Sequence, residues 1–381
     1  MRPMRIKIKN FKTVKEANLE LGKVTVLLGP PSSGKSNVLE ALALLGYPYR
    51  LKLRELYKSP SNVKPTLHDI IRLESVEDIF YFREKGRKIL IKALPLRSKV
   101  STIKEHSTGK EVATVEIYFE KGNPVAKVNN VAAKIIIESL SYSYISEWPQ
   151  LLELALDARL YGYDRYALTQ KLPDVLKYSP THEVSDILFE DSSNIVSVLN
   201  AYERILWTIN EWFESLDIRI DLRLLRDGKV VVFDYVKEMP LRLLSDTVGR
   251  ILYYITALYT CIQYVKAYGL RDRLILMLEE PEAHVFPYSF QLLVNLIKEA
   301  SKEMFVVLTS HNGSFVSHLW DRVKDVKTYY TYRDKRGSTK IVEVSIGKLA
   351  KDLITGSELL VLTPKEVHEK YTVETAVKTE K

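Results

Sequence analysis

The residues with the clearest chemical potential form a loop near the N-terminus, Gly29-Pro-Pro-Ser-Ser-Gly34-Lys35-Ser36, which fits the pattern GxxxxGK[ST]. In such a loop, free backbone N–H groups and the start of the next helix bind phosphate. Pro30 and Pro31 have no N–H, so later residues must supply the donors. Lys35 should bridge the β- and γ-phosphates, and the Ser36 hydroxyl should bind Mg²⁺. The nucleotide-contacting residues that we expect are Gly29, Ser32, Ser33, Gly34, Lys35, Ser36 and Asn37.

A pair of glutamates, Glu279 and Glu280, follows the apolar run 274–278. Ligands of open α/β sheets bind at the carboxyl ends of the strands, so these carboxylates are placed for chemistry. Glu279 can hold Mg²⁺, directly or through water, while Glu280 can polarise an attacking water. His311 follows a second apolar run, 305–308. Alone it is more often a satisfied turn residue, but its position 31 residues after Glu280 favours a role in the site.

The elements that must position these residues are predicted from periodicity. Residues 4–9 alternate as a half-exposed strand that 19–21 can pair with, 23–28 form a buried strand, and a helix starts at Ser36. An antiparallel sheet is expected from strands at 78–83, 88–93, 113–120 and 125–128. Its predicted turns are Gly86, Gly109 and Gly122-Asn123.

From residue 146 to 216 the pattern becomes helical, with helices expected at 151–160 and 194–213. We interpret this stretch as an inserted helical lid. Beyond it, the predicted strands are 217–223 and 229–235, separated by a turn at Asp227-Gly228, and then 274–278 and 305–308. The predicted helices are 246–268 and 289–301. A hairpin at 328–344 turns at Arg336-Gly337 and precedes a charged tail that we expect to fray beyond Pro364.

Composition narrows the class of protein. The chain has 381 residues, 46% hydrophobic and 27% charged, which excludes intrinsic disorder, and its one cysteine excludes a disulfide scaffold. It lacks the run of about 18 apolar residues needed to span a bilayer, and its alternating N-terminus is unlike a signal peptide. We therefore expect a cytoplasmic protein. Few glutamines beside abundant Lys and Glu lean towards a thermophile.

The net positive charge of the chain is confined to one segment. Residues 50–104 hold 14 Lys/Arg and 6 Asp/Glu, a balance of 14 − 6 = +8, which equals the net charge of the whole chain. Such a segment can attract a nucleic-acid backbone through counterion release. Solvated faces of ordinary strands and helices are the alternative.

Several motifs together carry a family resemblance: the entry strand with IKNF, the loop followed by SNVLEAL, the EEPEAHVFP segment and the strand ending in SHN. They resemble the ABC-type ATPase heads of the SMC-like and OLD-like superfamily, in particular compact archaeal and bacterial AAA-type ATPases with an EEPEAHLHP Walker B. The resemblance covers residues 1–48 and 240–320. It implies ATP and Mg²⁺ as cofactors, Lys35 and Ser36 as Walker A ligands, Glu279 as the Walker B metal carboxylate, Glu280 as the catalytic carboxylate and His311 as the γ-phosphate switch.

Such heads also carry a signature motif, about 30 residues before Walker B, that contacts the γ-phosphate of the partner subunit. Here Leu244-Ser245-Asp-Thr-Val-Gly249-Arg250 stands at that distance, and Ser245 is a plausible N-cap. Ser245, Gly249 and Arg250 are therefore candidate nucleotide contacts, with an N-cap and nothing more as the alternative. The glycine falls one or two places late, Pro31-Ser32 replaces the usual Asn-Gly of Walker A, and residues 1–149 offer no Gln for a Q-loop.

The predicted fold class is an α/β P-loop NTPase of the ABC-type head, with an antiparallel β subdomain and an inserted helical lid. We expect four parts: 1–140 as the N-lobe, 141–216 as the lid, 217–347 as the C-lobe and 348–381 as a charged tail. The roughly 70 residues after His311 hold no Glu…Asp-x-Asp arrangement, so we expect no nuclease.

The predicted function is Mg²⁺-dependent ATP hydrolysis by a head whose ATP-bound homodimer acts on DNA, in repair or defence, or on a separate effector protein. A nucleotide switch with little hydrolysis is the alternative. Asp246-Thr-Val-Gly249 matches the DxxG of GTPases, but 241–245 is not a clean strand and no [NT]KxD follows. A transporter ATPase is disfavoured by the missing Q-loop glutamine.

Overall fold

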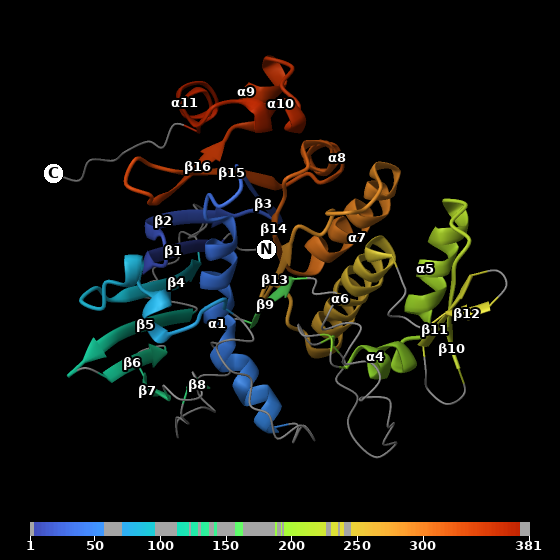
Figure 1. Ribbon diagram of the computed structural model, residues 1–381, viewed down its shortest axis with the longest axis horizontal. Helices are drawn as coiled ribbons and strands as arrows, with labels where there is room; N and C mark the ends of the chain where they lie inside the picture. The colour runs from blue at the N-terminus through green and yellow to red at the C-terminus, as the bar shows by residue number, and fades with distance from the viewer. Residues whose placement is uncertain are drawn as a thin grey trace, which may run out of the picture.

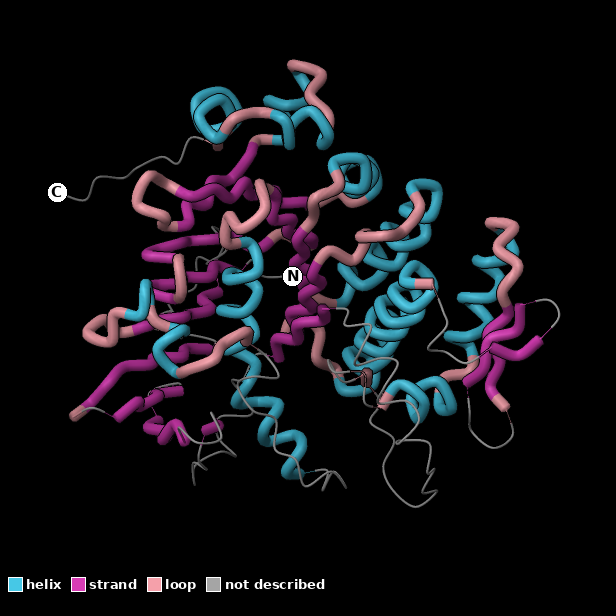
Figure 2. The backbone as a smooth tube through the Cα atoms, viewed as in Figure 1, coloured by secondary structure: helices cyan, strands magenta, loops and turns pink. Residues whose placement is uncertain are grey.

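The computed structural model describes most of the chain, and the described residues form two large sheets and one small sheet with flanking helices (Figure 1). The described residues are 4–56, 71–95, 113–121, 123–128, 131–136, 141–142, 157–162, 187–188, 192, 194–225, 230–234, 237–239 and 245–373. Figure 2 shows that strands occupy the centre and one side of the molecule, while helices make up most of the other side.

The central sheet has the order β16-β15-β3-β14-β13-β9. Its parallel strands are β3 (Val24–Leu28), β9 (Asp157–Gly162), β13 (Leu274–Glu279), β14 (Phe305–Thr309) and β15 (Val326–Arg333). Strand β16 (Thr339–Val344) runs antiparallel at one edge. Every residue of β3 and β14 is buried, which explains their continuous apolar sequences.

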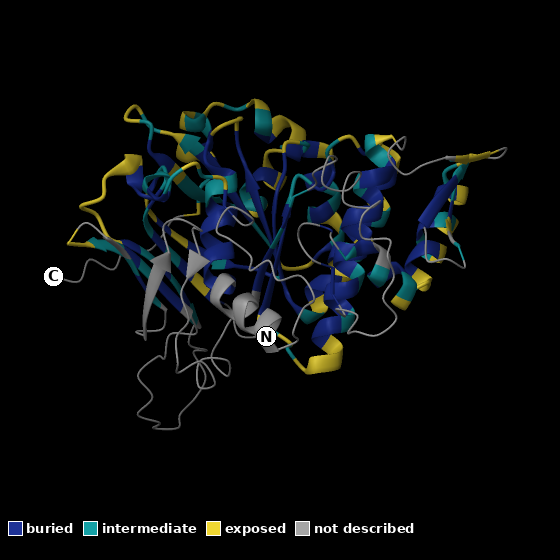
Figure 3. Cartoon of the chain, turned by 60° about the horizontal axis from the view of Figure 1, so that its bottom comes forward, coloured by how far each residue is buried: buried dark blue, intermediate teal, exposed yellow. Residues whose placement is uncertain are grey.

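Helices cover both faces of this sheet, as the buried strands between them show in Figure 3. Helix α1 (Lys35–Leu56) lies on one side, whereas α6 (Asp246–Tyr268) and α7 (Phe290–Glu303) lie on the other. Alternate residues of β3 divide accordingly: Leu27 joins the core cluster around α1, and Val26 joins the cluster around α6 and α7. Helix α8 (Gly313–Arg322) follows β14 and packs beside α7.

The second sheet is antiparallel and lies against α1, as expected for the β subdomain. Its strands in spatial order are β2 (Val14–Leu21), β1 (Met4–Phe11), β4 (Ile89–Pro95), β5 (Ala113–Glu120), β6 (Asn123–Val128), β7 (Val131–Ile136) and β8 (Ser141–Tyr142). The last two were not predicted. Ile6 and Ile91 point inward and share a core cluster with Leu42 of α1.

The strand predicted at 78–83 is wrong. The segment forms two short 3-10 helices, η2 (Val76–Ile79) and η3 (Tyr81–Arg83). The Asp78 carboxylate accepts hydrogen bonds from the backbone N–H groups of Glu74 and Ser75, both at 2.9 Å, which closes a turn in place of a ladder. Phe82 has a left-handed backbone, with φ of 48°, that a strand cannot accommodate.

The region expected to be a helical lid is helical only in part. Residues 194–213 form two helices, α4 (Ile195–Ala201) and α5 (Arg204–Ser215). The end of the helix predicted at 151–160 is wrong, because 157–162 form the edge strand β9, whose pairing with β13 overrides the local pattern. Residues 151–156 lie outside the described residues. The predicted domain boundaries stay a prediction.

A small three-stranded sheet packs beside α5, made of β10 (Asp221–Leu224), β11 (Val230–Asp234) and β12 (Lys237–Met239). The Asn210 side chain joins it to the helix: its Nδ2 donates to the Leu222 carbonyl at 2.8 Å, and its Oδ1 accepts from the Leu222 N–H at 2.9 Å. Strand β10 starts at Asp221, four residues later than the pattern predicted. The predicted turn at Asp227-Gly228 lies outside the described residues.

The C-terminal hairpin forms as predicted, but the tail after it is ordered further than expected. Its elements are α9 (Ile346–Lys351), α10 (Gly356–Val361), α11 (Pro364–Glu366) and a π-helix (Val367–Tyr371). Leu359, Val367 and Tyr371 are buried in the main core, so fraying directly after Pro364 is wrong. Of the helices that the structure describes, none has both the length and the apolar character to span a bilayer.

Candidate nucleotide site

The loop between β3 and α1 has the backbone that its glycines predict. Gly29 and Gly34 have φ of 139° and 101°, values that favour glycine. A Cβ on Gly29 would lie 2.1 Å from the Thr331 carbonyl oxygen, and one on Gly34 would lie 2.1 Å from Thr339 Oγ1. The loop is therefore seated tightly on the β15–β16 hairpin, and both glycines are sterically required.

Side chains of that hairpin hold the loop, and sequence reasoning missed them. Ser33 Oγ lies 2.6 Å from Thr331 Oγ1, and Arg333 Nε donates to the Ser32 carbonyl at 2.8 Å. Thr339 Oγ1 donates to the Ser33 carbonyl at 3.1 Å. The alternation of residues 328–333 predicts a strand, but nothing local reveals that this strand pairs with β3.

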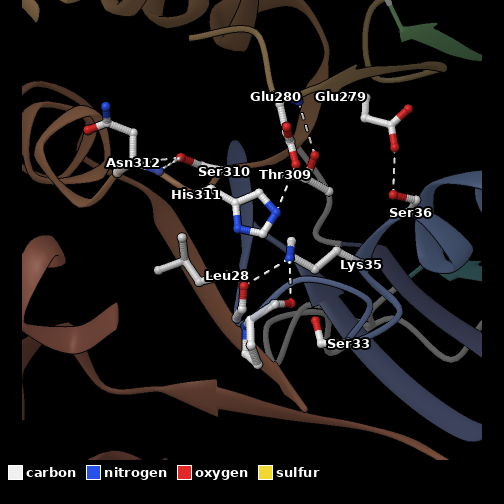
Figure 4. Close-up of polar contacts among 12 residues, drawn as sticks. Leu28, Ser33, Lys35, Ser36, Glu279, Glu280, Thr309, Ser310, His311 and Asn312 are labelled. Atoms are coloured by element: carbon white, nitrogen blue, oxygen red, sulfur yellow. Dashed lines mark hydrogen bonds and ion pairs between the residues drawn. The ribbon is translucent and has the colours of Figure 1, made fainter. Parts of the chain in front are cut away.

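Lys35 opens α1 and is almost fully buried, at 5% exposure. Its Nζ donates to the carbonyls of Gly29 and Pro30, at 2.9 and 3.0 Å, which curls the side chain over the loop. Burial lowers the pKa of Lys35 to about 8, against the opposing pull of Glu280 and Glu279. The ammonium is thus mainly charged at neutral pH and lies beside the acidic strand end (Figure 4).

The strand end after β13 supplies the two predicted carboxylates. Glu279 Oε1 accepts a hydrogen bond from Ser36 Oγ at 2.5 Å, and its backbone carbonyl accepts one from the Tyr254 hydroxyl of α6 at 2.6 Å. Glu280 has φ of 46°, an uncommon backbone for glutamate, and its N–H donates to Thr309 Oγ1 at 3.1 Å. The turn therefore aims the two side chains differently: Glu279 towards Ser36, and Glu280 towards the loop after β14.

Glu280 and His311 are in side-chain contact, with 2.8 Å between Oε1 and Nε2. Figure 4 shows the imidazole between Glu280 and Lys35. The hydrogen bond from His311 lowers the pKa of Glu280, helped by the charges of Lys35 and Arg250 and opposed by burial. The carboxylate is therefore ionised at neutral pH, as a group that orients a water must be.

Ser36 and Glu279 suit Mg²⁺. A hydroxyl and a carboxylate in contact are two hard oxygen donors, and Mg²⁺ with nucleotides commonly takes few protein ligands and several phosphate and water oxygens. Within the described ranges there is no cluster of three or more His, Cys, Asp and Glu that could hold a metal ion by itself. The donor set thus fits a metal shared with phosphates.

Arg72 lies in the site, although the sequence did not indicate it as a site residue. In the sequence it is one of the 14 Lys/Arg of the segment 50–104. Its Nη2 lies 2.8 Å from Glu279 Oε1, and its Nε lies 2.9 Å from Glu40 Oε1. Glu40 is 2% exposed and also pairs with Lys12 of the β1–β2 turn. Arg72 therefore links Glu279, through Glu40, to the β1–β2 turn of the antiparallel sheet. No motif marks it, because its partners are distant in sequence.

The predicted signature segment begins α6. Ser245 is the N-cap, with its Oγ accepting from the Val248 N–H at 3.4 Å, which confirms the capping prediction. Thr247 Oγ1 donates to the His284 carbonyl at 2.6 Å, so the start of α6 rests on the turn after β13 of its own chain. Arg250 Nε pairs with Asp246 Oδ2 at 3.0 Å. Leu244 lies outside the described residues.

Asn37, the last predicted nucleotide contact, donates through Nδ2 to Thr13 Oγ1 at 2.7 Å. Thr13 Oγ1 also lies 2.8 Å from Thr339 Oγ1. In this structure Asn37 therefore ties the start of α1 to the β1–β2 turn and, through that turn, to the hairpin under the loop.

Within the basic segment, residues 71–95 carry six Lys/Arg and four Asp/Glu, a balance of 6 − 4 = +2 out of the +8. Their cations pair mostly with nearby acids: Arg83 with Asp78 at 2.7 Å, Lys85 with Glu77 at 2.5 Å, Arg87 with Glu84, and Lys88 with Glu116 at 2.5 Å. The described part is thus closer to a solvated, charge-balanced face than to a free basic surface.

Comparison with known proteins agrees with this geometry. Residues 1–154 match the family model of an AAA ATPase domain. No curated protein matches the sequence. A solved SMC head bound to the C-winged helix domain of ScpA shares 17% identity, with a TM-score of 0.53, over 92% of this chain and 100% of that one. An SMC head with an extended coiled coil, bound to the C-terminal domain of ScpA derived from Pyrococcus furiosus, shares 15% identity over 92% and 98%, with a TM-score of 0.52.

The fold is therefore that of a P-loop NTPase, with parallel and antiparallel sheets arranged as in SMC heads. Residues 1–154 match an AAA ATPase domain, and the chain as a whole has the fold of SMC heads. This confirms the resemblance carried by the four motifs and the predicted fold class.

Proposed function

We propose that this head binds ATP with Mg²⁺ and hydrolyses it. The observation that carries the proposal is convergence: Lys35 and Ser36 from the loop after β3, Glu279 and Glu280 from the end of β13 and His311 from the end of β14 meet in one place. Lys35 would neutralise the β- and γ-phosphates, while Ser36 and Glu279 would hold Mg²⁺, which when bound offsets the charge of the same phosphates.

Glu280 is the candidate for orienting the attacking water. Its carboxylate is ionised and partly exposed, so it can accept a hydrogen bond from a water placed beside the γ-phosphate. His311 holds that carboxylate through Nε2 and would face the γ-phosphate. The contact between Glu280 and His311 favours hydrolysis over the alternative function, a nucleotide switch with little hydrolysis.

We further propose that ATP joins two copies of the head, with Ser245, Gly249 and Arg250 of one copy facing the nucleotide of the other. The N-cap geometry of Ser245 supports this, because the start of a 23-residue helix favours a phosphate. In the present structure Arg250 also acts within its own chain, where its charge lowers the pKa of Glu280.

The proposed work of the head is on DNA, in repair or defence, with a separate effector protein as the second candidate. The net positive charge of the basic segment 50–104 supports DNA as the partner. The ion pairs within residues 71–95 reduce the part of that charge that these residues can offer to phosphates. The effector is supported by the two SMC heads above, which are bound to domains of ScpA. The single, buried Cys261 suits the reducing cytoplasm that we propose as the location.

The substitution Glu280→Gln tests the proposal, because the amide keeps the size of the side chain but cannot act as a carboxylate. We expect ATP turnover to fall by about 100-fold or more while ATP still binds, and ATP-bound dimers to accumulate. Turnover is measured by phosphate release and dimers by light scattering after gel filtration. The matched control is Glu299→Gln on α7, an exposed glutamate paired with Lys302. Normal turnover in the Glu280 variant would show that another group orients the water.

A further inference from the structure

A third carboxyl, Glu282, lies in the turn after β13, two residues beyond Glu280, and has no role in the steps above. It is 3% exposed. Its Oε1 accepts a hydrogen bond from Ser310 Oγ at 2.6 Å and another from the backbone N–H of His311 at 3.2 Å. Its Oε2 is buried and has no hydrogen-bond partner among the described residues. Glu282 thus connects the turn after β13 to the residue that carries the switch imidazole.

This carboxyl is costly for the fold. Burial raises the pKa of Glu282 to about 7, although the Ser310 hydroxyl and backbone N–H groups favour its charged form. An unpartnered polar atom in the interior adds a further cost, and an apolar side chain of similar volume would avoid both. Protonation does not remove the contacts, because Oε1 can remain the acceptor in either state. The polar group therefore persists at a stability cost, which points to a role in the neighbouring site.

The side chains of Glu280 and His311, near which Glu282 lies, are only loosely packed. The side chains of His311 and Glu280 are 36% and 38% exposed, so neighbouring atoms leave them room to move. Glu280 is fixed through its backbone N–H to Thr309, and Ser310 through its backbone N–H to the Leu27 carbonyl at 3.2 Å. The backbone N–H of His311 is held by Glu282 instead. The position of the imidazole thus depends on a side chain three residues from the metal carboxylate.

We propose that Glu282 is a positioning residue of the hydrolytic site: its buried carboxyl anchors Ser310 and His311 and thereby sets the contact between His311 Nε2 and Glu280. The expected effect on kcat rests on the proposed ATPase function, whereas the expected effect on the position of the His311 imidazole does not. Glu282 touches neither nucleotide nor metal in this scheme. Its removal should therefore lower kcat and leave the affinity for ATP nearly unchanged.

Two variants test this. Glu282→Leu removes both anchors and should lower kcat by about tenfold or more. Ser310→Ala removes only the hydroxyl, leaves the backbone contact and should lower kcat by about threefold to fivefold. In both variants the dissociation constant of ATP should stay within about twofold of that of the parent protein. Val294→Ala, at a buried residue of α7 that takes part in none of these hydrogen bonds, is the control for reduced stability alone.

A second readout is independent of activity. In protein carrying ¹⁵N-labelled histidine, Glu280→Gln should shift the imidazole resonances of His311, because it replaces the carboxylate that faces Nε2. We expect this shift to shrink by more than half when Glu282→Leu or Ser310→Ala is already present. A head that hydrolyses no ATP but shows this weakened response would refute the proposed function and keep the positioning role.

The positioning role is overturned if kcat of both variants matches that of Val294→Ala and the His311 resonances respond to Glu280→Gln as in the parent protein. If Glu282→Leu does not fold, Ser310→Ala decides by the same two measurements.

Discussion

The candidate nucleotide site, here called the nucleotide face, consists of Lys35, Ser36, Glu279, Glu280 and His311. It and the described part of the basic segment, 71–95, both contain several charged side chains, but they are built differently. At the nucleotide face, charges from segments about 240 residues apart meet around one lysine, as the contact of Ser36 with Glu279 shows. In residues 71–95, Arg83, Lys85 and Arg87 pair with acids of the same short segment. Convergence of distant elements therefore marks the site, and the number of charges does not.

Burial separates the two regions as well. Lys35 is 5% exposed and its pKa is lowered to about 8, whereas the Arg83 side chain is 69% exposed in its pair with Asp78. Exposed ion pairs contribute about 0–1 kcal/mol and are screened by salt. Groups withdrawn from water interact strongly with a phosphate that replaces the water. We expect substitutions at the nucleotide face to have the larger effects, in the order that follows.

The largest effect is expected for Lys35→Ala. The variant lacks the buried ammonium of the loop, and charge-assisted bonds to two phosphates are worth several kcal/mol together, so ATP affinity should fall by at least about 100-fold. Fluorescence titration with a labelled ATP analogue measures it. Lys302→Ala on α7, exposed and paired with Glu299, is the matched control from a surface like that of the basic segment. An affinity within about threefold of the parent value would rule out the assignment of the phosphate loop.

The next effect concerns pH and Glu282. Its pKa is about 7 in the folded protein against an ordinary value of 4.5, so the folded state holds the proton more tightly. This tighter proton binding adds about 3 kcal/mol to the free energy of unfolding. The contribution is fully present below about pH 4.5 and is lost as the pH rises towards and through about 7. Urea unfolding at pH 4.5, 6 and 7.5 should show this decline in the parent protein relative to Glu282→Gln. A stability difference between the two that is independent of pH would mean that the carboxyl titrates normally.

Much of the site could be predicted from local sequence because each part sits where an apolar run ends. Lys35 follows strand β3, Glu279 is the last residue of β13 and His311 follows β14. The parallel sheet brings these strand ends together. The 23 residues of α6 also match the predicted helix, since its cap and apolar spacing are local signals.

Long-range pairing explains what local sequence missed. Strand β9 carries a pattern that resembles the end of a helix, and only its place beside β13 makes it a strand. Arg333 reaches Ser32 from 301 residues away, and Arg72 reaches Glu279 from 207 residues away. Contacts between single side chains that are hundreds of residues apart leave no local pattern in the sequence. These two contacts therefore become visible only in the structure.

Arg72 joins the two regions compared above, because it belongs to the basic segment by sequence and to the nucleotide face by contact. Arg72→Ala removes a cation 2.8 Å from Glu279 Oε1, so we expect Mn²⁺, as a probe for Mg²⁺, to bind about twofold to fivefold more tightly in the presence of a non-hydrolysable ATP analogue. Electron paramagnetic resonance of free Mn²⁺ measures this affinity. The control is Arg271→Ala, which is exposed to the same degree and pairs with Glu303 at 3.7 Å. Weaker Mn²⁺ binding would instead make Arg72 a support for the metal site.

The smallest effect is expected where exposed cations already have acidic partners. If the head binds duplex DNA, its logarithmic affinity should fall linearly with the logarithm of salt concentration, and the removal of one phosphate-binding cation should flatten the slope by about 0.9. Changing Lys85, Arg87 and Lys88 to Gln should flatten it by less than about one, because Glu77, Glu84 and Glu116 offset these charges.

The matched variant changes Arg97, Lys99 and Lys104 to Gln, which removes the same number of cations from a stretch of 96–104 with no Asp or Glu. We expect this variant to flatten the slope by about two to three, measured by fluorescence anisotropy between about 50 and 300 mM salt. Equal flattening by both variants would mean that the ion pairs of residues 71–95 open on DNA, and that a charge-balanced face binds phosphate as well as a stretch without acidic residues does.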